Sequence, residues 1–427
     1  MKRMSLYSER PEGLLDSELY AALDLAILSQ KDRLRKVLLL PPDFTRFHSG
    51  AGKIANHLYH VLKDTCQVDV MPTLGTHVPM TDEEIRQMYG DIPLERFIVH
   101  NWREDVVKLG EVPQEYVTEV SEGLVNEAIP VEVNRLVVDP SYDLVLSIGQ
   151  VVPHEVVGMA NYGKNLFVGC GGRDMINIVH MLGAFYGLER LMGRDFSPVR
   201  KVFDYAEEHF LQKVPLCYIL TVTTAPKGEI QMHGLFIGRE RRAFEEAVAL
   251  AQQTNMIFVD KPMKKCVVLL DEHEFKTTWV GNKAVYRTRM AIADGGELVI
   301  LAPGVERFGE DMGIDAIIRK YGYCGRENVL RLVKENRDLQ ENLGAAAHLI
   351  HGSSDGRFSI TYCTQKVPEE EIRQVHFNWA PYAETVKRYN PETLSDGWNT
   401  LPDGEEIYFI RNPALGLWAD KARFGAN

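Results

Sequence analysis

Hydrophobic and polar residues follow two repeating patterns along the N-terminal half of the chain. In residues 16–30 the apolar residues recur every three or four positions, so they share one face and predict an amphipathic helix. The next apolar run, KVLLL at residues 36–40, is short and unbroken, and two prolines stop it, which is typical of a buried strand. A helix followed by a strand is therefore the first unit of the predicted fold.

Two more strands with following loops are predicted before residue 155. One lies in residues 68–77, and the capping sequence TDEE at residues 81–84 marks the start of the helix after it. Another strand, at residues 143–148, leads into a loop that ends at His154. Strands that alternate with helices predict a mostly parallel, doubly wound α/β sheet.

A second series of strands and helices begins near residue 265. Because 427 residues are too many for one hydrophobic core, we predict two α/β domains with mostly parallel sheets and an active site in the cleft between them. The predicted domains are residues 1–262 and 263–404, and the pattern leaves open whether residues 405–427 pack back on the first. The predicted strands of the second series are 265–271 and 295–303, and its predicted helices are 283–292, 314–322, 327–335 and 369–375.

Composition and charge narrow the range of partners. The net charge is −12, from 48 basic and 60 acidic residues, so neither nucleic acid nor an anionic membrane is expected to bind. No apolar run approaches the length of a membrane span, and the N-terminal residues have no apolar segment typical of a secretory signal. Six cysteines lie far apart without a CxxC pair, which indicates a reduced, cytoplasmic chain.

Polar side chains follow three of the predicted strands in the first domain. Asp43 and Arg46 come after the first strand, His77 after the second and His154 after the third. Ligands of α/β proteins bind outside the carboxyl ends of the strands, so we expect these residues on one rim. The ordinary alternatives are a local ion pair for Asp43 and Arg46 and a simple turn histidine for His77.

Residues 152–180 place two further polar side chains among glycines and apolar residues. Lys164 could lose part of its hydration there, which would lower its pKa and make the amine available for covalent chemistry, or it could reach the surface as many lysines do. His180 fits a core histidine as well as a metal ligand. The glycine-rich segment at residues 169–174 matches neither the P-loop nor the GxGxxG pattern, so it is a weak phosphate signal.

Taken together, these residues resemble the nickel-dependent lactate racemase family and its 2-hydroxyacid racemase and epimerase relatives. The sequence GGELVILAP, which begins at Gly295, also looks like the strand of that family's second domain. The order and spacing of the motifs carry the resemblance: DFTR at residues 43–46, GTH at 75–77, Pro153-His154, Lys164 ten residues later and His180 sixteen beyond that.

The resemblance implies a nickel cofactor in the first domain. In that family a nickel-pincer nucleotide, derived from a pyridinium mononucleotide, is covalently attached to a lysine, here Lys164. Nickel is held by the cofactor and by one histidine, here His180. Asp43 and Thr45 are implied to lie beside the cofactor, and separate enzymes that synthesise the cofactor are implied as partners.

The resemblance also implies an isomerase that inverts the C2 centre of a small 2-hydroxy acid. His77 and His154 correspond to the two histidines that flank the substrate as alternating general base and acid. Arg46 and, in the second domain, Lys283 correspond to residues that bind the substrate.

One position departs from the family pattern and bears on the substrate. Lactate racemases carry a glutamine three residues before the second-domain lysine, where this chain has Val280. We therefore favour a polyhydroxylated sugar acid, such as an aldonate, over lactate. The extra polar residues nearby could serve it or could be ordinary fold residues: Trp279, Asn282, Arg287, Arg289 and the segment from His351 to Arg357.

Two other functions and one other metal site agree less well with the sequence. An NAD-type dehydrogenase would also use a doubly wound sheet, but the GxGxxG motif is missing. A non-catalytic protein that binds an organic acid or the nickel cofactor would not need both His77 and His154. His348 and His351 have the spacing of a metal-binding pair, without an obvious third ligand.

Overall fold

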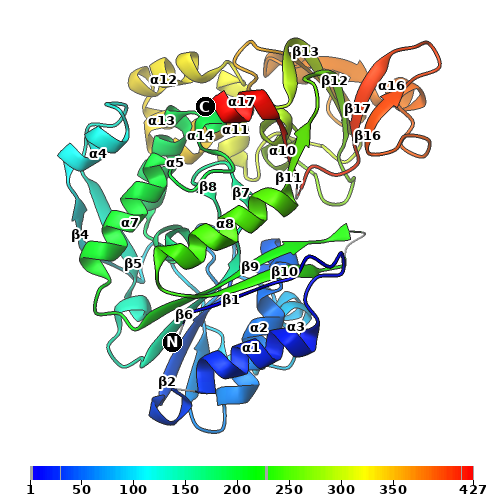
Figure 1. Cartoon of the computed structure of the whole chain (residues 1–427). Coiled ribbons are helices and arrows are strands. Elements are labelled where there is room, and N and C mark those ends of the chain that lie inside the picture. Colours follow the sequence, from blue (N-terminus) through cyan, green and yellow to red (C-terminus); the bar gives the residue numbers. More distant parts are fainter. Residues whose placement is uncertain (1–2, 29, 227–228, 415, 427) are drawn as a thin grey trace. The chain divides into compact units, whose positions relative to one another are not determined.

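The structure is a computed structural model that describes residues 3–28, 30–226, 229–414 and 416–426. The chain forms two compact units (Figure 1). The first contains Met1–Leu182 and Leu191–Asn255, and the second contains Gly183–Arg190 and Met256–Asn427. Sequence periodicity does not reveal the short segment Gly183–Arg190, which belongs to the second unit although it interrupts the first.

A six-stranded mixed sheet forms the centre of the first unit. Four neighbouring strands, β9, β6, β2 and β3, run parallel to each other, while β10 and β1 are added antiparallel at one edge. In sheet order the strands are β1 (Met4–Tyr7), β10 (Gln231–Gly238), β9 (Leu216–Thr224), β6 (Leu144–Gln150), β2 (Lys36–Leu40) and β3 (Gln67–Val70).

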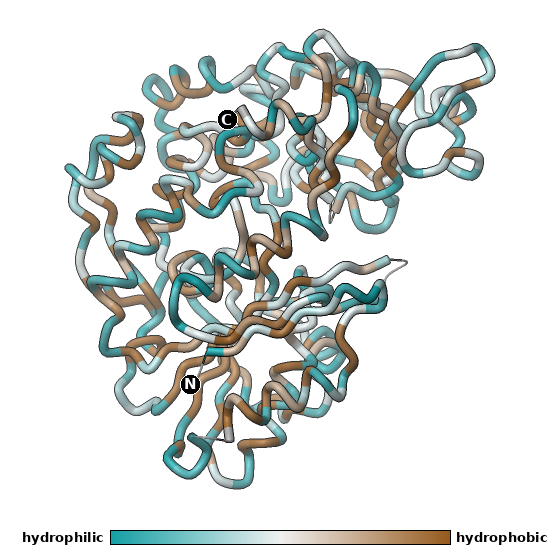
Figure 2. Tube along the Cα trace, in the orientation of Figure 1, coloured by the Kyte–Doolittle hydropathy of each residue, from teal (hydrophilic) through white to brown (hydrophobic). Residues whose placement is uncertain are grey.

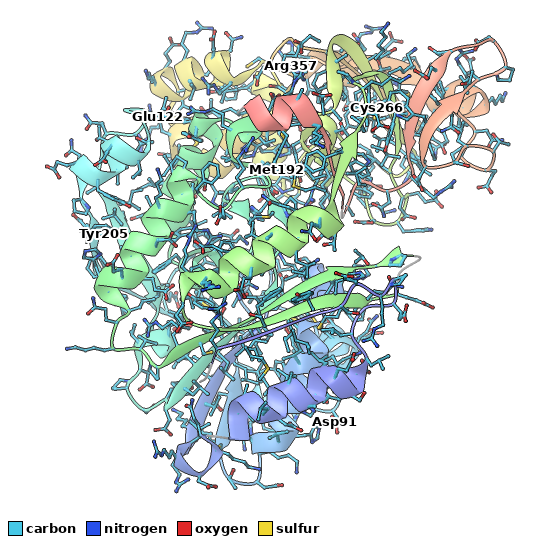
Figure 3. All side chains as sticks on the ribbon, viewed as in Figure 1. Asp91, Glu122, Met192, Tyr205, Cys266 and Arg357 are labelled. Carbon is cyan, nitrogen blue, oxygen red and sulfur yellow. The ribbon has the colours of Figure 1, made fainter. Side chains whose placement is uncertain are left out.

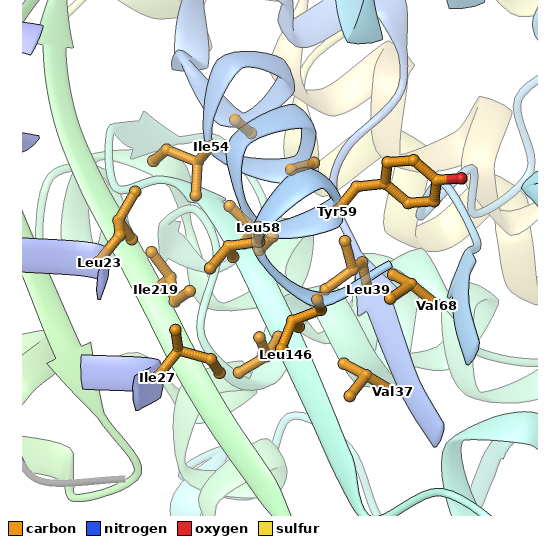
Figure 4. Packing of buried hydrophobic residues seen from close by; sticks show 14 of the residues in the cluster. Leu23, Ile27, Val37, Leu39, Ile54, Leu58, Tyr59, Val68, Leu146 and Ile219 are labelled. Carbon is orange, nitrogen blue, oxygen red and sulfur yellow. The ribbon is translucent and has the colours of Figure 1, made fainter. Parts of the chain in front are cut away.

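Helices cover both faces of this sheet (Figure 1). The helix predicted from residue 16 is α1 (Asp16–Leu28), and it packs with α2 (Ala51–Leu62) on one face; α8 (Arg241–Asn255) packs on β9 and β10 from the other. Leu23 and Leu58 from the two helices meet Leu39 and Leu146 from the strands in a core that excludes water (Figure 4). The apolar residues accordingly concentrate in the strands and on the inner helix faces (Figure 2).

The second unit has its own six-stranded sheet, in which only one pair is antiparallel. The strand order is β15 (Asn378–Pro381), β14 (Ser359–Thr364), β13 (Ile292–Ala302), β12 (Met263–Leu269), β17 (Glu406–Ile410) and β16 (Gly397–Thr400), and β16 is the antiparallel strand. A separate parallel pair joins β11 (Met256–Val259) to β18 (Leu417–Asp420). The predicted class, two α/β units with mostly parallel sheets, is confirmed.

Most of the predicted helices of the second unit are present. They are α11 (Met312–Tyr321), α12 (Arg326–Glu335) and α15 (Glu369–Gln374). The helix predicted over 283–292 is wrong at its end: α10 spans only Lys283–Thr288. Ile292 already begins β13, where it lies opposite Met263 of β12, and a residue in a parallel ladder cannot also continue a helix.

The C-terminal segment contributes its strands to the second unit. The sequence left open whether residues 405–427 return to the first domain. Instead, β17 pairs with β12 and β18 pairs with β11, and all four strands belong to the second unit. Among the described residues, no helix is long and apolar enough to cross a membrane.

Candidate functional site

The candidate residues of the first unit are positioned by the carboxyl ends of three parallel strands. Asp43 immediately precedes the short 3-10 helix η2 (Phe44–Ser49) that follows β2, and His77 lies in the turn that follows β3. His154 belongs to the two-residue strand β7 (Pro153–His154), which follows β6 and pairs with β8 (Gly158–Met159). Because β3, β2 and β6 are parallel neighbours, these ends share one edge of the sheet.

Asp43 and His77 form a carboxylate–histidine pair. His77 Nδ1 lies 2.6 Å from Asp43 Oδ2, and the Thr45 hydroxyl donates to Asp43 Oδ1 at 2.6 Å. Burial acts to raise the pKa of Asp43, but the hydrogen bonds from His77 and Thr45 outweigh it and hold this pKa below its ordinary value. The carboxylate therefore accepts from Nδ1–H, orients the ring and leaves the Nε2 lone pair available to take a proton.

The two partners differ in exposure. The Asp43 side chain is 7% exposed and the His77 side chain is 55% exposed. Tyr89, which is fully buried, donates its hydroxyl hydrogen to the carbonyl of Pro42 and so supports the backbone next to Asp43. A fixed carboxylate thus holds an accessible ring, which is the arrangement that a proton-transferring histidine needs.

His154 has the opposite hydrogen-bonding arrangement. Its ring is buried, and its Nδ1 accepts a hydrogen bond from the backbone N–H of Val156 at 3.1 Å. A neutral ring that accepts at Nδ1 carries its proton on Nε2. Burial, and then the charges of Lys164 and Arg46, hold the pKa of His154 well below its ordinary value, so the neutral form with Nε2–H prevails.

Lys164 stands at the start of a π-helical turn, η5 (Asn165–Gly169). Such turns are rare and recur at functional sites. The buried side-chain amide of Asn165 donates to the Ser147 hydroxyl at 3.1 Å and to the carbonyls of Leu40 and Ile148 at 3.3 Å each. These contacts tie the Lys164 segment to the ends of β2 and β6.

The environment of Lys164 favours a neutral amine. Part of its surface remains accessible, yet burial, followed by the charge of Arg46, lowers its pKa from 10.5 to about 7. Among the described residues, no hydrogen bond or ion pair to its Nζ is found. A lysine that is partly neutral near pH 7 is a competent nucleophile, which is the first of the two alternatives that the sequence left open for Lys164.

The low pKa of Lys164 predicts a pH-dependent gain in stability for Lys164→Met. In the unfolded chain the amine titrates near 10.5, and in the folded chain near 7. As the pH falls from 10.5 towards 7, the amine binds a proton in the unfolded chain but not yet in the folded chain. The wild type therefore loses stability over this range, whereas the variant, which has no amine at this position, does not. We expect the variant to be more stable by about 1–3 kcal/mol at pH 7 and equally stable above pH 10.5, measured by urea denaturation of the apoprotein. Equal free energies of unfolding for the variant and the wild type at pH 7 would contradict this prediction.

His180 lies on α5 (Arg173–Tyr186), and its orientation suits a metal ligand. Its Nδ1 donates to the carbonyl of Ile176 at 2.6 Å, which leaves the Nε2 lone pair available. Metal-bound histidines commonly use their second nitrogen in this way. Burial lowers the pKa of His180, and the charges of Lys164 and His77 act on the same ring, so His180 shares their surroundings.

The glycine-rich segment after η5 is explained by close packing. A Cβ added at Gly171 would stand 2.0 Å from the carbonyl oxygen of Phe167, and one at Gly172 would stand 2.2 Å from Glu132 Oε2. Only glycine permits such an approach of backbone to neighbour. The segment therefore needs no bound phosphate to account for its composition.

The remaining candidate residues lie in the second unit. Lys283 is the first residue of α10, and its Nζ lies 4.0 Å from Glu274 Oε1. Arg289 and Arg357, the latter labelled in Figure 3, both pair with Glu189, at 3.0 and 2.6 Å. These two arginines therefore hold the segment Gly183–Arg190 to the second unit, which is a structural role.

The two histidines of the HLIH segment have protein partners of their own. His348 Nε2 lies 3.0 Å from the Tyr323 hydroxyl, and its ring packs 4.2 Å from that of Trp279. Within the described ranges, no group of three or more His, Cys, Asp or Glu residues could hold a metal ion. His348 and His351 remain a pair without a third ligand.

Two residues that support the candidate site were not predicted from the sequence. Asn165 anchors the lysine segment, and Tyr89 supports the backbone before Asp43. The sequence signal for Asn165 is a polar residue directly after Lys164, at the start of the otherwise apolar run NLFVG. Tyr89 has no comparable signal, because a tyrosine at the end of an amphipathic helix looks like an ordinary core residue.

The chain is an α/β protein whose first unit contains a lysine and three histidines as candidate site residues. They are Lys164, His77, His154 and His180. Residues 24–188 match the lactate racemase N-terminal domain family, a segment that spans less than half of the chain but holds every candidate residue of the first unit. The resemblance drawn from the sequence is confirmed over these residues. Comparison with curated proteins finds no match.

Two solved structures share the fold over nearly the whole chain. A protein from Thermotoga maritima superposes with a TM-score of 0.80 at 24% identity, covering 97% of this chain and 100% of that one. The lactate racemase apoprotein from Thermoanaerobacterium thermosaccharolyticum superposes with a TM-score of 0.69 at 16% identity, covering 90% of this chain and 87% of that one. At these identities the likeness is one of fold.

Proposed function

We propose that this protein is a racemase or epimerase that inverts the C2 centre of a 2-hydroxy acid with a nickel-pincer nucleotide attached at Lys164. The observation that carries the proposal is the gathering of Lys164, His180, His77 and His154 in one unit, each with the electrostatic surroundings that its role requires. Membership of residues 24–188 in the lactate racemase N-terminal domain family supports it.

The residues present fit the cofactor. Lys164 offers an amine with a pKa of about 7 and no partner among the described residues, which suits covalent attachment. His180 offers Nε2 to nickel, while Asp43 and Thr45 are proposed to lie beside the cofactor. When bound, the nickel-pincer nucleotide would accept the C2 hydrogen of the substrate as hydride and return it to either face. Separate enzymes must supply this cofactor.

His77 and His154 are proposed to handle the hydroxyl proton of the substrate. His77 presents a lone pair at Nε2, and Asp43 stabilises the charged ring that forms when it takes a proton. His154 presents Nε2–H from a buried, neutral ring and can donate a proton or a hydrogen bond. Each configuration at C2 requires its own imidazole, which explains why the site contains both histidines.

The substrate proposal rests on the sequence. Arg46 and, in the second unit, Lys283 are proposed to bind the carboxylate or hydroxyl of the substrate. Val280 lies in α9 (Thr278–Gly281), where the lactate racemases carry a glutamine. We favour a longer polyhydroxylated acid, such as an aldonate inverted at its second carbon, over lactate.

The test is a panel of 2-hydroxy acids in deuterated water, with protein co-expressed with the cofactor-making enzymes. We expect nickel in the purified protein, an added mass at Lys164, and inversion at C2 without deuterium at that carbon. A racemase that works through an enol would incorporate solvent deuterium. Protein that contains no nickel, and turns over only with free nicotinamide cofactor, would show a dehydrogenase and contradict the proposal.

A further inference from the structure

The segment that leads to Lys164 is clamped by the first turn of a helix far along the chain. Helix α7 (Pro198–Phe210) is capped by Ser197, whose hydroxyl donates to the carbonyl of Val157 at 2.9 Å. One turn on, Arg200 Nη2 donates to the carbonyl of Met159 at 2.7 Å and to that of Asn161 at 3.2 Å. The two side chains thus bind three alternate carbonyls of the segment between Val157 and Asn161.

The clamped segment ends in an unusual backbone turn. Asn161 and Tyr162 both have positive φ angles, 66° and 56°, which side chains other than glycine adopt reluctantly. The Asn161 side-chain oxygen accepts the Tyr162 N–H at 2.6 Å and supports the turn from within. Gly163 and Lys164 follow at once, so the direction of this turn sets where the lysine side chain begins.

Arg200 is an unusual residue to find in this position. It is fully buried, its guanidinium lies 4.4 Å from the centre of the Phe244 ring, and its Nε and Nη1 have no hydrogen-bond partner among the described residues. No ion pair to it occurs in the described part of the chain. A buried cation that makes no ion pair is costly, although the nearby charge of Asp204 offsets part of this cost. The guanidinium can bind the two carbonyls, which an apolar side chain in its place could not do.

We propose that Arg200 is the positioning residue for Lys164, and that by binding the carbonyls of Met159 and Asn161 it holds the left-handed turn from which the lysine amine is presented to its electrophile. The proposal rests on the proposed function in one respect, that Lys164 is the residue to be modified. The guanidinium also places a positive charge near the amine, and this charge acts on Lys164 together with that of Arg46 to favour the neutral form.

The experiment measures the reactivity of Lys164 in the apoprotein, so it needs neither nickel nor turnover. Wild type, Arg200→Met and Arg200→Lys are pulsed with acetic anhydride over a pH series. Acetylation at Lys164 is quantified by peptide mass spectrometry, with the exposed Lys213 as internal reference. We expect Arg200→Met to lower the rate at Lys164 several-fold at neutral pH and to move its half-reaction pH upward, because loss of the charge favours the protonated amine. Arg200→Lys keeps the charge, so its half-reaction pH stays while its rate falls.

A matched control separates this role from general support of the fold. Arg239 also donates to two backbone carbonyls, those of Val214 and Leu211, both at 2.7 Å. Arg239→Met should leave the rate and the half-reaction pH of Lys164 unchanged. The proposal is overturned if Arg200→Met behaves like wild type at Lys164, or, should that variant not fold, if Arg200→Lys reacts at the wild-type rate. If wild type carries no nickel cofactor while Arg200→Met still slows acetylation, the proposed function fails and this inference stands.

Discussion

Replacing Lys164 with methionine yields a folded protein that carries no covalent cofactor and does not invert its substrate. The result is expected because the amine, with its pKa of about 7, is the proposed point of attachment in the first unit. Methionine retains the aliphatic length, so the packing around residue 164 is preserved. Intact-mass spectrometry of protein co-expressed with the cofactor-making enzymes measures the attachment, and chiral analysis of the product measures the activity.

The matched control for this variant is Lys213→Met. Lys213 is exposed, so its substitution should leave both the added mass and the turnover at wild-type values. If Lys164→Met retained the added mass, another residue would be the tether. If it lost the mass but kept its activity, the cofactor would have no part in the reaction.

Replacing His77 with glutamine lowers turnover about 10²–10⁴-fold while the cofactor stays attached. His77, which Asp43 holds at 2.6 Å, is proposed to take a proton at Nε2, and glutamine can fill the space but cannot take the proton. Because the ring is 55% exposed, the melting temperature should hardly change. Single-turnover kinetics, nickel content and intact mass together separate loss of chemistry from loss of cofactor.

The variant Asp43→Asn tests the same proton transfer with a milder change, because it leaves His77 itself in place. The amide can no longer stabilise a charged His77 ring, so turnover should fall, while the nearly identical shape of asparagine preserves the local packing. His154→Gln is a less direct test, because His154 is buried and its loss would also affect stability. If the His77→Gln variant inverted the substrate at the wild-type rate, His77 would have no part in the proton transfer.

The local pattern of the chain was sufficient to predict three strands of the first sheet, β2, β3 and β6, and the edge of the sheet at which the candidate residues lie. The apolar run at β2 with its two prolines, the capping box at Thr81 and the glycine that closes α11 each act within a few residues. Since parallel strands end on one edge, the polar residues after β2, β3 and β6 could be placed together without any knowledge of packing. The end of α10 was predicted wrongly, because the pairing of Ile292 with Met263 depends on residues almost thirty positions apart.

The amino-acid sequence by itself determined the α/β class, and through the family resemblance it singled out the residues that we propose to carry the chemistry. Only the tertiary structure decided what state those residues are in. The Asp43–His77 pair joins residues 34 positions apart, the low pKa of Lys164 arises mainly from burial, and Arg200 reaches the backbone of Asn161 across 39 positions. Helical and strand periodicity reports contacts within a turn or a ladder, whereas hydration and proton affinity are set by every atom that packs around a group.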